Sequence, residues 1–187
     1  MGALSLHCAR WLLAAALLLT APPAHADAGG KPALLLAKAL SYERRLADTK
    51  GKSVGIAVLF AADSASSKQE AQRWVASFQA LGSVQVHGVS VEVWAVPHQP
   101  ARVSDFVRDH GVDVLLACEG TSFAEIAALA RQHKILSSGD TPAAIAGNLS
   151  LGVFMEKSKP RILINMRAAK AEGAIFSAKL LQLAELL

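Results

Sequence analysis

The chain has 187 residues, of which 52% are hydrophobic and 18% are charged, and its formal net charge is +4 at pH 7. A chain of this length and apolar content can form one domain with a buried core. Its Lys and Arg residues are spread along the sequence with acidic residues between them. The composition therefore lacks the concentrated basic surface that is typical of nucleic-acid-binding proteins.

The N-terminus has the features of a cleavable secretory signal. Arg10 provides a positive charge, residues 11–21 are apolar, and Ala24-His25-Ala26 is a small-x-small cleavage site. The apolar run is about half of the roughly 20 residues that are needed to span a bilayer. We therefore predict cleavage after Ala26, a location in the periplasm and a single domain over residues 27–187.

The two cysteines do not form a pair in the predicted mature chain. Cys8 lies before the apolar run of the signal, whereas the acylated cysteine of a lipoprotein would follow it, so no lipid anchor is predicted. Removal of the signal leaves Cys118 alone, which excludes an intramolecular disulfide even in an oxidising compartment.

Helices and strands alternate in the first half of the predicted domain. In chain order, they are an amphipathic helix from Ala33 to Ala47, a buried strand from Val54 to Phe60, a helix from Ser67 to Gly82, and a strand from Val84 to Val96 with a bend at Gly88. Ser67 and Glu70 have the spacing of a capping box at the start of their helix. Trp74 and Phe78 belong to one apolar stripe of that helix, which we interpret as core.

The same alternation continues in the second half. A short helix stops at Gly111 and is followed by a buried strand from Val112 to Ala117, a helix capped by Ser122 and a strand from Ile135. A turn with Pro142 at a first helical position comes next. The chain ends with a hairpin of strands 151–156 and 161–165, a helix from Arg167 to Gly173, and a last helix from Ser177 to Leu187. We expect the last helix to cover the sheet.

This alternation predicts an α/β fold of three layers. It is a mostly parallel, Rossmann-like sheet with helices on both faces, a C-terminal antiparallel hairpin and a closing helix. Ligands of such sheets bind outside the carboxyl ends of the strands. The polar residues of three loops at these ends form a candidate ligand pocket: Asp63, Ser64, Glu119, Gly120, Thr121, Ser138, Asp140 and Thr141. Helix capping is the alternative interpretation, because the same residue types favour helix ends for stability alone.

Catalytic and metal hypotheses find little support in the sequence. Cys118 would need a neighbouring base, and no spacing brings His87, His98, His110 or His133 to it. These histidines also lack the short paired spacing of zinc sites. Hydrolase, phosphate-loop and dinucleotide motifs are absent. We predict no catalysis, metal or cofactor, and keep as a secondary hypothesis an enzyme that uses Cys118 or the carboxylates of Asp63, Glu119 and Asp140.

The C-terminal segment carries the densest basic charge and the most specific motif. The basic residues, Lys157, Lys159, Arg161, Arg167, Lys170 and Lys179, suit either a solvated rim or a docking face for an acidic partner. The motif consists of I-N-x-x-A-A, a glycine and S-x-K-L-L-x-L-A, at Ile164, Asn165, Ala168, Ala169, Gly173, Ser177, Lys179, Leu180, Leu181, Leu183 and Ala184. It resembles the C-terminal signature of the YfiR family.

The resemblance implies a function and a partner. Proteins of the YfiR family are periplasmic, bind the periplasmic domain of an inner-membrane diguanylate cyclase, and keep that cyclase inactive, which lowers cyclic-di-GMP and biofilm formation. Many carry cysteine pairs linked to redox control, which the lone Cys118 does not reproduce. We therefore expect a regulator that contacts a membrane protein of this kind. A small ligand at the strand ends and a homodimer are both left open.

The alternative is a solute-binding protein. The receptors of ABC transporters have a similar closing motif, but they consist of two lobes and are about twice as long. This chain has room for one lobe. On this interpretation the protein would be a single-lobe solute receptor.

Overall fold

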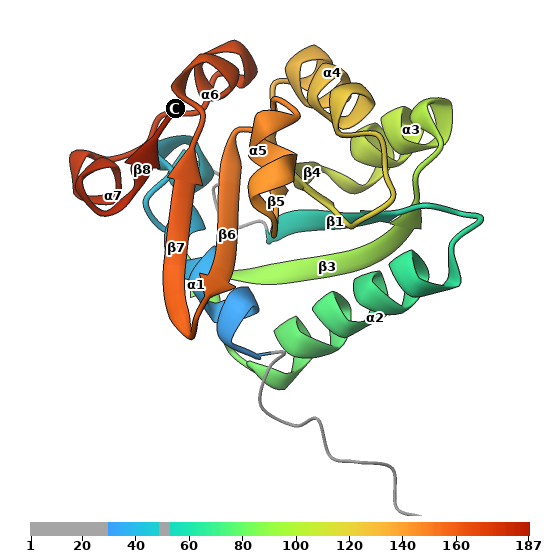
Figure 1. The fold of residues 1–187 in the computed structure, drawn as a ribbon, viewed down its shortest axis with the longest axis horizontal. Coiled ribbons are helices and arrows are strands. Elements are labelled where there is room, and N and C mark those ends of the chain that lie inside the picture. Colours follow the sequence, from blue (N-terminus) through green and yellow to red (C-terminus); the bar gives the residue numbers. More distant parts are fainter. Residues whose placement is uncertain (1–29, 49–52) are drawn as a thin grey trace, which may run out of the picture.

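The computed structural model describes residues 30–48 and 53–187, so the predicted signal and its cleavage site lie outside the described residues. The helices are α1 (Gly30–Leu40), the 3₁₀ helix η1 (Arg44–Asp48), α2 (Ala65–Ala80), α3 (Pro100–His110), α4 (Phe123–His133), α5 (Pro142–Ala146), α6 (Met166–Glu172) and α7 (Ala178–Leu183) (Figure 1). The strands are β1 (Val54–Phe60), β2 (Gln85–Val86), β3 (Val89–Pro97), β4 (Val112–Ala117), β5 (Leu136–Gly139), β6 (Leu151–Glu156), β7 (Lys159–Ile164) and β8 (Glu185–Leu186). None of these helices is long and apolar enough to cross a membrane.

In the described part of the chain, the strands form one sheet in the order β2-β3-β1-β4-β5-β6-β7-β8. Strands β3, β1, β4, β5 and β6 are parallel to one another. Strands β2 and β7 run antiparallel to β3 and β6. β1 is buried at every position because it lies in the middle of a sheet that is covered on both faces. The predicted fold class, a mostly parallel α/β sheet with a C-terminal hairpin, is therefore confirmed.

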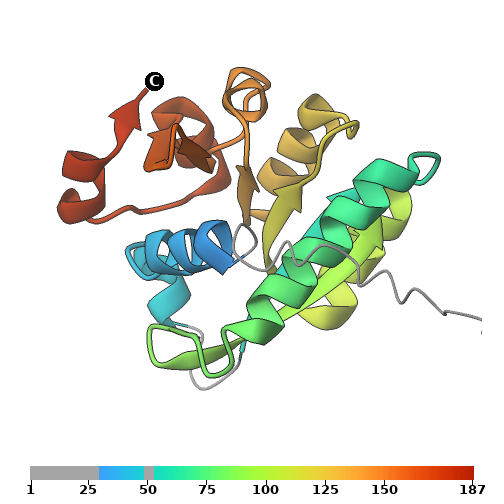
Figure 2. The same ribbon diagram turned by 60° about the horizontal axis from the view of Figure 1, so that its bottom comes forward.

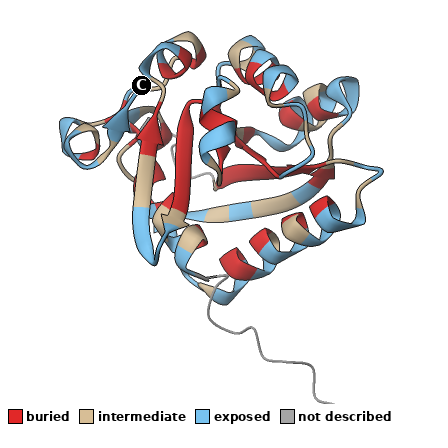
Figure 3. Cartoon of the chain, viewed as in Figure 1, coloured by how far each residue is buried: buried red, intermediate tan, exposed pale blue. Residues whose placement is uncertain are grey.

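Each face of the sheet has its own apolar core. α1 and α2 cover one face, and α3, α4 and α5 cover the other (Figures 1 and 2). The central strands are buried, whereas the outer sides of the helices are exposed (Figure 3). Trp74 and Phe78 of α2 are both 6% exposed, which confirms their interpretation as core aromatics.

Two predictions for the N-terminal half are wrong. The helix predicted from Ala33 to Ala47 stops at Leu40, because Glu43 leaves the helical path to form a β-bridge with Phe176. The capping box at Ser67 is also wrong. Ser64 caps α2 instead, and its Oγ accepts a hydrogen bond from the N–H of Ser67 at 3.3 Å.

Two strand and helix boundaries also differ from the sequence prediction. The single strand predicted from Val84 to Val96 is a hairpin, because His87 and Gly88 adopt positive φ angles of 52° and 82° and turn the chain between β2 and β3. The last helix ends at Leu183, and the chain then forms β8 parallel to β7. α7 buries only Leu180 among its own residues and lies beyond β7 instead of covering a sheet face (Figure 1).

Other local predictions are confirmed. Pro142 begins α5, Ser122 caps α4, and Ser177 caps α7. Gly111 and Gly173 end α3 and α6 in the left-handed region, with φ angles of 63° and 79°. A glycine adopts this conformation without the steric cost that a side chain would bring.

Candidate functional site

The carboxyl ends of β1, β4 and β5 meet at one edge of the sheet, next to the first turns of α2. The register places Ala117 beside both Leu59 and Gly139. Ser67 of α2 joins two of these ends, because its Oγ donates to the carbonyl of Glu119 at 2.6 Å and accepts from the N–H of Ala61 at 3.0 Å. The start of α2 is therefore tied to the loops where the sequence predicted a ligand pocket.

Glu70 gathers two predicted pocket residues around it. Its Oε2 accepts a hydrogen bond from the N–H of Glu119 at 3.1 Å, and its carboxyl shares a hydrogen bond with that of Asp140. Trp74, one turn further along α2, opposes the rise in the pKa of Asp140. Burial and the Asp140 charge raise the pKa of Glu70 to about 7, and burial raises the pKa of Asp140. The carboxyl group of Glu70 therefore titrates near neutral pH.

The sequence analysis missed Glu70 as a member of this site. The local spacing of Ser67 and Glu70 predicted a capping box. Because the capping box already explained Glu70, no role at the strand ends was considered for it. The available signal was its place one turn before Trp74, on the side of α2 that faces the sheet.

Most other predicted pocket residues have local structural roles. Thr141 caps α5, and the Oγ1 of Thr121 donates to the carbonyl of Cys118 at 2.7 Å. Gly120 forms a turn with a φ angle of 82°. Asp63 is exposed, Ser64 caps α2, and Ser138 is fully buried within β5. Of the predicted set, Glu119 and Asp140 are the two residues that meet at Glu70.

Cys118 lies at the end of β4 in surroundings that disfavour a thiolate. Its side chain is fully buried. Burial and the nearby carboxyls of Glu70 and Asp140 raise the pKa of the thiol, which is the opposite of the shift that a nucleophilic cysteine requires. Among the described residues, no group of three or more His, Cys, Asp and Glu side chains is arranged to hold a metal ion.

A second concave surface lies near the C-terminus, between α6, α7 and the segment that joins them. We call it the C-terminal groove. It has a volume of about 690 Å³ and is lined by Met166, Arg167, Ala169, Lys170, Gly173, Ala174, Ile175, Phe176 and Leu181. Large apolar side chains are exposed in and near it, namely Met166, Ile175, Leu183, Leu186 and Leu187. A concentration of exposed apolar side chains is typical of a surface that another molecule covers.

The charges at the C-terminal groove are basic. Arg167 and Lys170 line it, and none of the described residues that line it is acidic. Two other basic residues of this region are engaged within the chain: Arg161 pairs with Glu156 and Glu185, and Nζ of Lys179 lies 5.6 Å from the centre of the Tyr42 ring. Arg167 also donates from Nη2 to Oδ1 of Asn148 at 3.4 Å. Arg167 and Lys170 are therefore the basic residues of this region that line the groove.

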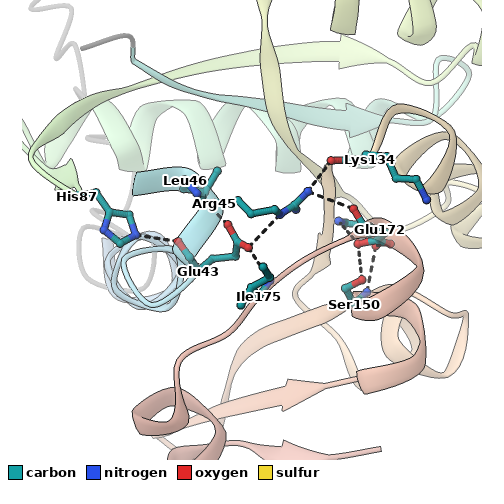
Figure 4. Close-up of polar contacts among 9 residues, drawn as sticks. Glu43, Arg45, Leu46, His87, Lys134, Ser150, Glu172 and Ile175 are labelled. Atoms are coloured by element: carbon teal, nitrogen blue, oxygen red, sulfur yellow. Dashed lines mark hydrogen bonds and ion pairs between the residues drawn. The ribbon is translucent and has the colours of Figure 1, made fainter. Parts of the chain in front are cut away.

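The groove is anchored to the sheet by Glu172, the last residue of α6. Glu172 is fully buried and accepts hydrogen bonds from the N–H and Oγ of Ser137, at 2.9 and 2.5 Å, and from the Oγ of Ser150 (Figure 4). Burial raises the pKa of Glu172, while the hydrogen bonds from Ser137 and Ser150 oppose that shift. α6 is thereby fixed on β5.

Several solved structures share this fold at low sequence identity. An ABC domain from Streptococcus pneumoniae in complex with L-Trp has a TM-score of 0.55 and 16% identity, with 84% of this chain and 61% of that chain covered. CD0873, a substrate-binding protein from Clostridium difficile, has a TM-score of 0.51 and 14% identity, with 73% and 55% covered. A conserved domain protein from Vibrio cholerae has a TM-score of 0.50 and 12% identity, with 79% and 59% covered.

The fold therefore defines a class, the α/β domains built on a mostly parallel sheet. This chain spans about 55–61% of the length of the three structures. Within the class, the chain belongs to the YfiR/HmsC-like family, whose profile matches residues 47–185. Membership of this family supports a role as a periplasmic regulator. Comparison with curated proteins found no match.

Proposed function

We propose that this protein is a periplasmic regulator that binds the periplasmic domain of an inner-membrane diguanylate cyclase and keeps the cyclase inactive. The observation that carries the proposal is the family match over residues 47–185. The secretion signal predicted over residues 1–26 supports the same compartment. The protein would lower cyclic-di-GMP by contact with the cyclase, without a reaction of its own.

We assign the contact to the C-terminal groove. Met166 and Ile175 are 41% and 51% exposed, and covering such side chains is favourable by about 25 cal/mol per Å² of apolar surface. Arg167 and Lys170 add positive charge without an acidic residue in the lining. The partner surface that fits is a large apolar side chain flanked by carboxylates.

Deletion of the gene followed by complementation tests this proposal. We expect deletion to raise cellular cyclic-di-GMP, and the wild-type protein to restore the low level. Ile175→Asp places a charge in the groove and should fail to restore it. Leu34→Asp is the matched control, because Leu34 is also a large exposed apolar residue, at 38%, but lies on α1.

Two results would count against the proposal. Unchanged cyclic-di-GMP after deletion would contradict the regulatory function. Full complementation by Ile175→Asp would leave the function intact and move the contact away from the groove.

A second candidate function is that of a single-lobe solute receptor. It is favoured by the fold shared with the pneumococcal domain that was solved with L-Trp, and by the carboxyl cluster of Glu70, Glu119 and Asp140 at the strand ends. A receptor that binds L-Trp, another amino acid or an anion would show a melting temperature that rises with the logarithm of ligand concentration. A flat response to all of them would contradict this candidate.

A further inference from the structure

One wall of the C-terminal groove is held by a segment from the other end of the domain. Residues 173–177 join α6 to α7, and residues 175–177 run antiparallel to residues 42–44. The N–H of Arg44 donates to the carbonyl of Ile175 at 2.9 Å, and the N–H of Ser177 donates to the carbonyl of Tyr42 at 2.9 Å. Residues 173–176 all line the groove, so its wall depends on this contact.

Glu43 supplies the buried charge of this contact. Its side chain is fully buried, and Oε1 accepts a hydrogen bond from the N–H of Ile175 at 2.7 Å (Figure 4). Oε1 also pairs with Nε of Arg45 at 3.2 Å, and Oε2 accepts from the N–H of Leu46 at 3.0 Å. A buried carboxylate is tolerated only when donors replace water. Two of these donors belong to η1 and one, the N–H of Ile175, belongs to the wall, so Glu43 loses a donor if the wall moves.

Arg45 connects the same contact to the ends of two helices. Its Nη1 donates to the carbonyl of Lys134 at 2.8 Å and to that of Glu172 at 3.2 Å (Figure 4). These carbonyls lie at the C-terminal ends of α4 and α6, where a positive charge is favourable. Gly173 leaves room for the guanidinium, because a Cβ on it would lie 3.3 Å from Nη1.

We infer that Glu43 and Arg45 are positioning residues that hold the wall of residues 173–176 at the spacing in which the groove receives a partner. Their side-chain hydrogen bonds join η1, the wall and the two helix ends. Their link to the sheet is electrostatic, because Arg45 lowers and Glu43 raises the pKa of Asp113 in β4. Loss of these contacts should therefore change the groove while the sheet stays folded. The inference rests on the proposed function, since it deepens the role of the same groove.

Arg45→Lys and Glu43→Gln are the informative variants. Lysine keeps the charge but lacks the planar fork that lets Arg45 bond Glu43 and two carbonyls at once. Glutamine at position 43 keeps one acceptor oxygen, but its NH₂ group then faces one of the N–H donors of Ile175, Leu46 or Arg45 and cannot accept from it. Arg44→Lys is the matched control, because the side chain of Arg44 is exposed and its bond to Ile175 comes from the backbone.

The test uses two readouts that do not need the cyclase. The first is hydrogen exchange at the amide of Ile175, which bonds Glu43 directly. The second is binding of 1-anilinonaphthalene-8-sulfonate, an apolar aromatic anion that matches the lining and the positive charge of the groove. Ile175→Asp places a negative charge in the groove, so weaker dye binding by this variant shows that the dye binds in the groove.

We expect Arg45→Lys and Glu43→Gln to speed exchange at Ile175 at least about tenfold and to weaken dye binding at least about threefold. Amides of β1 and β4 should stay protected, and Arg44→Lys should behave as wild type. The inference would be overturned if Ile175→Asp bound the dye as tightly as the wild type does. It would also be overturned if both positioning variants kept the dye affinity of the wild type. Loss of protection in β1 and β4 would also overturn it, because the two residues would then serve the stability of the whole fold.

Binding of the cyclase domain is measured separately on the same variants. Failure of the wild-type protein to bind that domain would contradict the proposed function, whereas the dye and exchange results would still decide the roles of Glu43 and Arg45. If the wild type does bind, both positioning variants should lose affinity and Arg44→Lys should not.

Discussion

The carboxyl groups of Glu70 and Asp140 share a hydrogen bond across the edge of the sheet, one from α2 and the other from the end of β5. Two carboxyl groups can make this bond only while one of them is protonated. The contact between α2 and the strand ends is therefore sensitive to pH, and it motivates the first prediction.

The free energy of unfolding should depend on Glu70 between about pH 4.5 and 7. The folded-state pKa of Glu70, about 7, lies above its ordinary value of 4.5. Its contribution is therefore fully present below pH 4.5 and is lost as pH rises through 7. For a half-exposed side chain we expect a loss on the order of 1 kcal/mol.

Glu70→Gln should remove most of this pH dependence. Glutamine can still accept from the N–H of Glu119 and can donate to Asp140 at every pH. Urea unfolding at pH 5, 6, 7 and 8 is the measurement. Parallel pH profiles for the variant and the wild type would contradict the raised pKa of Glu70.

Glu172→Ala should be strongly destabilising. The substitution leaves the N–H and Oγ of Ser137 and the Oγ of Ser150 without their buried acceptor, at a cost of about 2–4 kcal/mol. Glu172→Gln keeps one acceptor oxygen and should cost less. Asp63→Ala removes an exposed carboxylate and is the control. Equal urea midpoints for Glu172→Ala and the wild type would refute this role of Glu172.

Gly139→Ala should force α5 away from β5. A Cβ on Gly139 would lie 2.4 Å from the Cβ of Ala144, so we expect a loss of about 1–3 kcal/mol. Ala144→Gly removes the obstructing atom, and the double variant should be more stable than the sum of the single losses implies. Strict additivity in thermal unfolding would show that this close contact does not limit stability.

Apolar patterning was enough to place the central strands. The strands predicted from Val54 to Phe60 and from Val112 to Ala117 coincide with β1 and β4, because both are buried on two faces. β1 is apolar throughout, and Asp113 is the one charged residue of β4. Gly111 and Gly173 were also correctly predicted as helix ends, because glycine favours the left-handed conformation that ends a helix. In these cases the structural cause lies within a few residues of the pattern.

The anchoring carboxylates could not be predicted in this way. Glu43 accepts from Ile175, which is 132 residues away, and Glu172 accepts from Ser137, which is 35 residues away. Their roles depend on contacts that exist only after the chain has folded. The helix expected from Ala33 to Ala47 failed for the same reason, because burial of Glu43 outweighed the local helical pattern.

The central claim is that the protein works by contact through the C-terminal groove. Isothermal titration calorimetry with the periplasmic domain of a membrane diguanylate cyclase, preferably one encoded beside this gene, tests it most directly. We expect the wild type and Leu34→Asp to bind alike, and Ile175→Asp to lose at least about tenfold in affinity, which corresponds to about 1.4 kcal/mol. Equal affinity for the three proteins, or no binding by the wild type, would contradict the account.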